Sequence, residues 1–173
     1  MKKIFAICGS TKASSTNLLY IIAISQLLGS GYEVTSLTSI ADIPHFNPDL
    51  DTEYPAEQVE QLRKKISEAD GILISTPEYA MGLPGSLKNI LDWTVSSSSF
   101  SKKQVLAIVA SSQGEKAYQS LIDILTVIEA EVHALLIPYA KTKINGEGNI
   151  THAETLSALQ AILDQFVAGI SNG

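Results

Sequence analysis

Short apolar runs rich in Val and Ile alternate with helical patterns along the whole chain. The clearest runs, residues 4–7, 72–74 and 105–109, are continuously apolar. Continuous runs of this length are typical of parallel strands that are covered on both faces. Residues 33–37, which alternate between polar and apolar, and residues 132–137 are weaker candidates. The sequence therefore predicts five strands, with 33–37 nearer an edge of the sheet.

Amphipathic segments lie between these runs. Residues 56–69 place their apolar side chains on one stripe, which predicts a surface helix. The last helix is expected to start at Thr151, with Glu154 completing a capping box. Residues 17–28 and 118–128 are apolar almost all round, which predicts deep burial or packing against a neighbouring subunit.

This alternation of strands and helices predicts an α/β fold with right-handed crossovers. We expect a doubly wound, five-stranded parallel sheet in the order 2-1-3-4-5, with helices on both faces. The length of 173 residues favours a single domain over 1–173. Ligands of such sheets bind beyond the carboxyl ends of the strands, at the switch point beside the first strand. The loops after strands one, three and four are therefore the expected site.

Charge and cysteine content narrow the possible partners. Twelve Lys and Arg against eighteen Asp and Glu give a net charge of −6. Nucleic acid and anionic membranes are disfavoured, because binding to them depends on Lys and Arg. Cys8, the one cysteine, is expected in the core and indicates a reducing compartment or at least indifference to oxidation. No apolar run is long enough for a signal peptide or a membrane span, so a cytoplasmic location is expected.

Metal binding is not expected, because the three histidines, His45, His133 and His152, share no ligand spacing. In the loop between the second strand and the next helix, Asp42, Asp49 and Asp51 are interpreted as solvated residues.

The loop after the first strand, residues 9–17, is rich in hydroxyl groups and carries one cation. Its short donors meet the positive end of a helix dipole, which suits a phosphate group. The spacing is neither that of a Walker A loop nor that of a dinucleotide fingerprint. An ordinary turn before a helix, with Ser15 or Thr16 as N-cap, is the alternative. The candidate ligands are Ser10, Lys12, Ser15, Thr16 and Asn17.

The loop after the third strand begins with the rigid turn at Pro77 and presents the ring of Tyr79. Gly82 and Gly85 let the backbone approach a ligand closely. A planar ligand held edge-on by backbone amides beside Tyr79 fits this pattern. Glu78 is interpreted as a carboxylate that fixes the loop rather than as a general acid.

Together these two loops resemble the NAD(P)H-dependent FMN reductases, which are flavodoxin-like. The match consists of G-S-x-[RK]-x-x-S-x-N after the first strand and P-E-Y-x-x-G-x-P-G-x-L-K-N-x-L-D-W after the third. The resemblance implies that the first loop holds the FMN phosphate. It implies that the isoalloxazine ring is lined by Pro77, Glu78, Tyr79 and Gly82, with Ala80 where relatives usually carry Asn. Lys12 replaces the commoner Arg of the family, which keeps the charge but loses the bidentate fork.

In the family, the loop after the fourth strand approaches the pyrimidine end of the flavin. Ser111, Ser112 and Gly114 are the corresponding candidates here, and a simple strand-to-helix turn is the alternative for Ser112 and Gly114.

The implied activity passes hydride from NADPH or NADH through FMN to a small acceptor: a flavin, quinone, azo compound or metal oxyanion. No side-chain acid, base or nucleophile is required, since the flavin carries the chemistry. A flavodoxin-type electron-transfer protein and a non-catalytic FMN-binding module are the alternatives. Family members mostly associate through the helix after the second motif, so a homodimer or homotetramer is expected.

Overall fold

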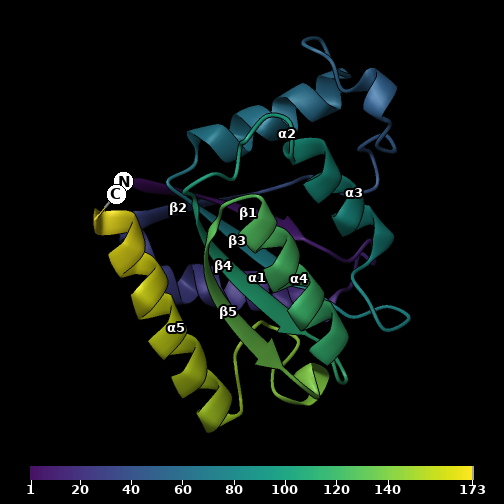
Figure 1. Ribbon diagram of the computed structural model, residues 1–173. Coiled ribbons are helices and arrows are strands. Elements are labelled where there is room, and N and C mark those ends of the chain that lie inside the picture. Colours follow the sequence, from purple (N-terminus) through teal and green to yellow (C-terminus); the bar gives the residue numbers. More distant parts are fainter. Residues whose placement is uncertain (173) are drawn as a thin grey trace.

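The computed structural model describes residues 1–172 and contains a five-stranded parallel sheet (Figure 1). The strands follow the order β2-β1-β3-β4-β5, which confirms the predicted doubly wound topology. Their bounds are β1 Lys2–Cys8, β2 Tyr32–Ser36, β3 Gly71–Thr76, β4 Gln104–Ala110 and β5 Glu131–Ile137. Each predicted apolar run therefore lies within one strand or, for 33–37, extends one residue beyond it.

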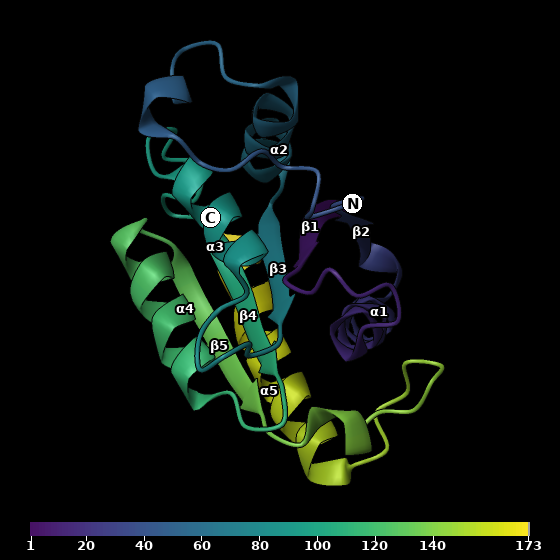
Figure 2. The same cartoon turned by 90° about the vertical axis from the view of Figure 1, so that its right-hand side faces the viewer.

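Within residues 1–172, five α-helices cover the two faces of the sheet. They are α1 Thr16–Leu28, α2 Glu57–Glu68, α3 Gly85–Thr94, α4 Glu115–Val127 and α5 Ala153–Asn172. Figure 2 shows α2, α3 and α4 on one side of the sheet and α1 on the other, and α5 packs in the same apolar core as α1. None of these helices has the length and apolar character of a membrane span within residues 1–172.

The central strands explain why the predicted runs are continuously apolar. Every residue of β3 is buried, and β4 is buried from Val105 to Ala110, because helices pack on both faces of these strands. Each fully buried Ile, Leu or Val side chain stabilises the fold by about 1.5–3 kcal/mol. β2 lies at an edge and stays half-exposed, as its alternating sequence predicts.

The expected start of the last helix is wrong. Helix α5 begins at Ala153, and its N-cap is His152 rather than Thr151: Leu156 donates its N–H to the His152 carbonyl, and Thr155 donates its N–H to His152 Nδ1. Ile22 of α1 is 44% exposed within this chain, so packing of residues 17–28 against a neighbouring subunit stays a prediction. Only the face of α1 that meets the sheet is fully covered.

The loop between β2 and α2 is ordered by side chains of α2 and α3. Trp93 is buried in the core and donates its indole N–H to the Pro44 carbonyl at 2.7 Å. Arg63 donates to the Asp51 carboxylate at 2.6 Å and to the Trp93 carbonyl. The interpretation of Asp51 as a solvated residue is therefore wrong, since its side chain is only 11% exposed.

Candidate active site

A cavity of about 690 Å³ opens at the carboxyl ends of β1, β3 and β4, where the topology predicts a ligand. Of the predicted site residues, all line this cavity except Ala80, Gly82 and Gly114. The lining residues are Ser10, Lys12, Ser14, Ser15, Thr16, Asn17, Pro77, Glu78, Tyr79, Ala110, Ser111, Ser112, Tyr139, Ala140, Lys141 and Thr142. The three predicted loops thus meet in one cavity, together with a segment after β5.

The first loop leaves β1 by passing close to the end of β3. The N–H of Gly9 donates to the Ser75 carbonyl at 2.8 Å, and a Cβ atom at Gly9 would collide with Thr76 Oγ1. Only glycine permits this close approach. Ser15 then caps α1 by accepting the N–H of Asn17 at 3.2 Å. These contacts fix both ends of the loop around an open centre.

Donors in the centre of the first loop remain available to a ligand. Within residues 1–172, the backbone N–H groups of Ser14, Ser15 and Thr16 make no hydrogen bond, and Lys12 makes no ion pair. These groups lie at the positive end of the α1 dipole. A phosphate monoester fits them, because it offers the acceptor oxygens and negative charge that they lack.

The side chain of Asn17 fixes the position of the first loop relative to the sheet. Its amide nitrogen donates to the Ala110 carbonyl at 3.2 Å, and its amide oxygen accepts from Ser75 Oγ at 2.9 Å. Asn17 and Ser75 are both buried. The side chain therefore ties the start of α1 to β3 and β4, which holds the free N–H donors of the first loop over the carboxyl edge of the sheet.

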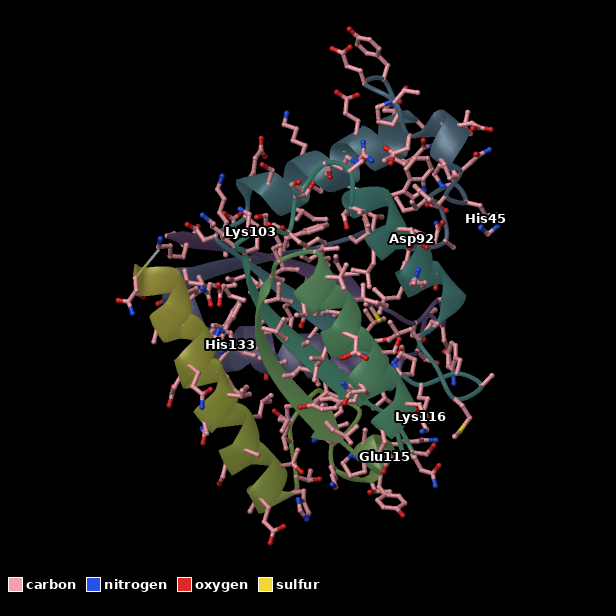
Figure 3. All side chains as sticks on the ribbon, viewed as in Figure 1. His45, Asp92, Lys103, Glu115, Lys116 and His133 are labelled. Carbon is pink, nitrogen blue, oxygen red and sulfur yellow. The ribbon has the colours of Figure 1, made fainter. Side chains whose placement is uncertain are left out.

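Glu78 joins the second loop to the first turn of α4. Its carboxylate accepts the N–H groups of Lys116 and Ala117, and its own N–H donates to Ser111 Oγ at 3.3 Å. Lys116 is labelled at the start of α4 in Figure 3. The interpretation of Glu78 as a loop-fixing carboxylate is confirmed.

Tyr79 and Gly82 close a two-residue turn at the rim of the cavity. They exchange backbone hydrogen bonds of 3.0 and 3.1 Å. The two intervening residues, Ala80 and Met81, have φ values of 48° and 63°. Positive φ at both positions is the signature of the type I′ turn, which favours Asn and Gly. The turn aims Tyr79 across the cavity, where its hydroxyl lies 3.1 Å from Ser10 Oγ.

Gly114 shapes the third loop from outside the cavity. It precedes α4 with φ of 111°, and a Cβ atom there would press on Leu136 and Val109. This supports the strand-to-helix turn for Gly114. Ser111 and Ser112 remain on the cavity wall.

The sequence did not reveal the wall formed by residues 139–142. Tyr139 adopts φ of 53°, and Ala140–Thr142 form a 3₁₀ turn beyond β5. No glycine marks this left-handed position, and the apolar run had ended before Pro138. The only available signal was Lys141, a cation soon after the carboxyl end of a strand.

Other reactive side chains do not converge on the cavity. Cys8 is half-buried, its Sγ lies 3.7 Å from the Ser10 carbonyl oxygen, and burial raises the pKa of its thiol. His45 and His133 lie on separate parts of the fold (Figure 3). Among residues 1–172, no three His, Cys, Asp or Glu side chains form a group that could hold a metal. The site therefore offers donors, one carboxylate and aromatic surface, and a bound cofactor would have to supply reactivity.

The parallel sheet in the order 2-1-3-4-5, with its hydroxyl-rich first loop, defines the flavodoxin-like class of fold. The chain belongs to the NADPH-dependent FMN reductase family, whose model matches residues 2–142. The structure is similar to the flavoenzyme FerB, an NAD(P)H:(acceptor) oxidoreductase from Paracoccus denitrificans. The two share 26% identity with a TM-score of 0.83, over 99% of this chain and 98% of FerB.

Two relatives match over nearly their whole length. A 2-hydroxy-1,4-benzoquinone reductase from a Burkholderia species is 28% identical, covering 97% of this chain and 96% of the relative. The NADH-dependent flavin reductase subunit 2 of Lactobacillus johnsonii is also 28% identical, covering 95% of each chain.

Proposed function

We propose that this protein is an NAD(P)H-dependent reductase that holds FMN in the cavity and reduces a small acceptor. One observation carries the proposal: the first and second loops line the same cavity. The first loop brings unpaired N–H groups and Lys12, and the second loop brings Tyr79. The first suits a phosphate, and the second suits a planar ring. Bound FMN would supply the hydride transfer between nicotinamide and acceptor.

The chain's own residues bind and position rather than react. The first loop donates to the phosphate, and Ser111 and Ser112 present hydroxyls to the polar edge of the ring. Glu78 keeps the second loop in place through α4. Ala80 and Gly82 act on the ring only through the shape of their turn, because neither lines the cavity. No side chain is required to donate or accept a proton in this scheme.

A quinone or a free flavin is the acceptor class that we favour. The similar proteins from Burkholderia and Lactobacillus act on these two kinds of molecule, as their names state. The rim of the cavity also offers exposed apolar surface, with Tyr79 47% and Met81 64% exposed. Planar aromatic acceptors match such a rim better than a hydrophilic oxyanion does.

Flavin titration followed by reduction tests the proposal. Purified protein should quench FMN fluorescence on binding and bind riboflavin more than about tenfold more weakly, because riboflavin lacks the phosphate and its charge-assisted hydrogen bonds. NADH or NADPH should then bleach the bound flavin anaerobically, and a panel of quinones, flavins, azo dyes and chromate should identify the acceptor. Bound flavin that resists both nicotinamides would favour an electron-transfer or binding module, and absence of uptake would end the proposal.

We also propose a homodimer or homotetramer in the cytoplasm. The nearly uniform apolar sequences of residues 17–28 and 118–128, which leave Ile22 and Val127 exposed in the single chain, support association. The lone cysteine supports a reducing compartment. Light scattering of the purified protein measures the assembly directly, and a mass of one chain would contradict it.

A further inference from the structure

The turn after β5 brings a second lysine into the cofactor cavity. Four consecutive residues, 139–142, line the cavity, and Lys141 is the cation among them. We propose that Lys141 acts with Lys12 to bind the phosphate group of FMN, so that the turn is a fourth loop of the cofactor site. This inference rests on the proposed function, because it assigns a role toward the same cofactor.

The turn is anchored to both neighbouring parts of the site. Tyr139 and Ala140 donate their N–H groups to the carbonyls of Ser112 and Ser111 at 3.2 and 3.0 Å. The hydroxyl of Tyr20 donates to the Ala140 carbonyl at 3.1 Å. Tyr20 is fully buried on α1, and burial raises the pKa of its hydroxyl to about 12, which keeps it a donor. Residue 140 is therefore fixed to the same helix whose N-terminus forms the phosphate cradle.

Backbone strain in the turn indicates that this placement is enforced. Tyr139 has φ of 53°, a left-handed conformation that is unfavourable for a residue with a side chain. Such strain persists where surrounding contacts impose it, and it concentrates at functional sites. The left-handed residue lets the chain reverse after β5, so that Lys141 and Thr142 join Thr16 on the wall of the cavity.

Charge balance in the cavity favours a dianion. Its lining contains two cations, Lys12 and Lys141, and one anion, Glu78. The Glu78 carboxylate is already engaged by two N–H groups of α4. Lys141 forms no ion pair within residues 1–172. A phosphate monoester carries a charge of about −1.5 to −2 at neutral pH, which one lysine would leave partly uncompensated.

Equilibrium binding of two flavins separates this role from others. Lys141→Met is expected to weaken FMN binding about tenfold, as loss of one charge-assisted contact does, and to leave riboflavin binding unchanged. Lys141→Arg should restore most of the FMN affinity. Flavin fluorescence at two salt concentrations provides the readout, and the FMN affinity of Lys141→Met should depend less on salt than that of the wild type.

Lys143→Met is the matched control. It removes the same charge two residues further on, where the side chain borders a different hollow beside His152 and Glu154. Both flavins should bind this variant as they bind the wild type, and the melting temperatures of both Met variants should equal that of the wild type.

Each of the following results would overturn the inference. Equal weakening of FMN and riboflavin by Lys141→Met would assign the residue to the ring or to the fold. Unchanged FMN affinity with a raised KM for NADH or NADPH would assign it to the nicotinamide nucleotide. Wild-type protein that binds neither flavin would remove the proposed function itself, whereas wild-type binding with an unaffected Lys141→Met variant removes only this inference.

Discussion

The carboxylate of Glu78 accepts the backbone N–H of Ala117 at 3.0 Å, across 39 residues of sequence. The same oxygen accepts the N–H of Lys116 at 2.9 Å. A residue of the second loop thus acts as the N-terminal cap of α4, whose preceding residue, Gly114, has no side chain to do so. These two hydrogen bonds therefore hold the second and third loops of the site in a fixed position relative to each other.

Removing this cap should loosen both loops. Glu78→Ala is expected to lower the free energy of unfolding by about 1–2 kcal/mol and to weaken FMN binding, because two helix N–H groups lose a charged acceptor. Urea denaturation and flavin titration measure these effects. Glu115→Gln is the control, since it removes a negative charge from the first turn of α4 without those two bonds. If both variants change stability equally, helix-dipole charge rather than the cap accounts for the effect.

A glycine in the turn at Ala80 and Met81 should stabilise the folded protein. Met81→Gly is expected to raise the free energy of unfolding by up to about 1 kcal/mol, because glycine adopts positive φ without steric cost. Met81→Ala removes the same exposed side chain but keeps the strain, so it should leave stability nearly unchanged. Thermal unfolding monitored by circular dichroism compares the two. A Met81→Gly variant less stable than Met81→Ala would show that the left-handed conformation is not maintained in solution.

Asn17 should matter more for stability than its place in a phosphate loop suggests. Asn17→Ala leaves the buried Ser75 hydroxyl without its acceptor and the Ala110 carbonyl without its donor, which should cost about 2 kcal/mol. Ser75→Ala in the same chain should recover part of this loss, because the unsatisfied hydroxyl disappears. A double-mutant cycle by urea denaturation tests the pair, and strictly additive losses would contradict the coupling.

The contact between Asp51 and Arg63 should make stability depend on pH. Burial by itself raises the pKa of the Asp51 carboxyl, but hydrogen bonds from Arg63 and Ser96 and the Arg63 charge outweigh it and hold the pKa below its usual value. The contribution is therefore present above the carboxyl pKa of the unfolded chain, about 3.9, and is lost as pH falls through the lower folded value.

Asp51→Asn is accordingly expected to lower stability at neutral pH and to flatten its decline at acidic pH. Denaturant unfolding at a series of pH values from 2 to 7 measures both. Asp49→Asn, an exposed carboxyl in the same loop, should follow the wild-type curve. Parallel curves for Asp51→Asn and the wild type would contradict the expected linkage.

The sequence determined the sheet and the position of the site. Continuous Val and Ile runs are required where both faces of a strand are covered, so the strands and their order could be predicted from local pattern and crossover handedness. Loops at the carboxyl ends of β1, β3 and β4 must then meet, and the hydroxyl, Pro and Gly residues of those loops identify the cavity.

The tertiary structure alone decided which residues line the cavity and which hold the loops. Asn17 has the chemistry of a phosphate ligand, yet distant partners on β3 and β4 occupy its amide. Tyr139 carries no turn signal. Hydrogen bonds from residues 139 and 140 to the loop after β4, and from Tyr20 to residue 140, bring Lys141 to the cavity. Local sequence specifies backbone preference and side-chain chemistry, whereas these roles depend on hydrogen-bond partners from remote segments, which become neighbours only when the sheet and helices pack.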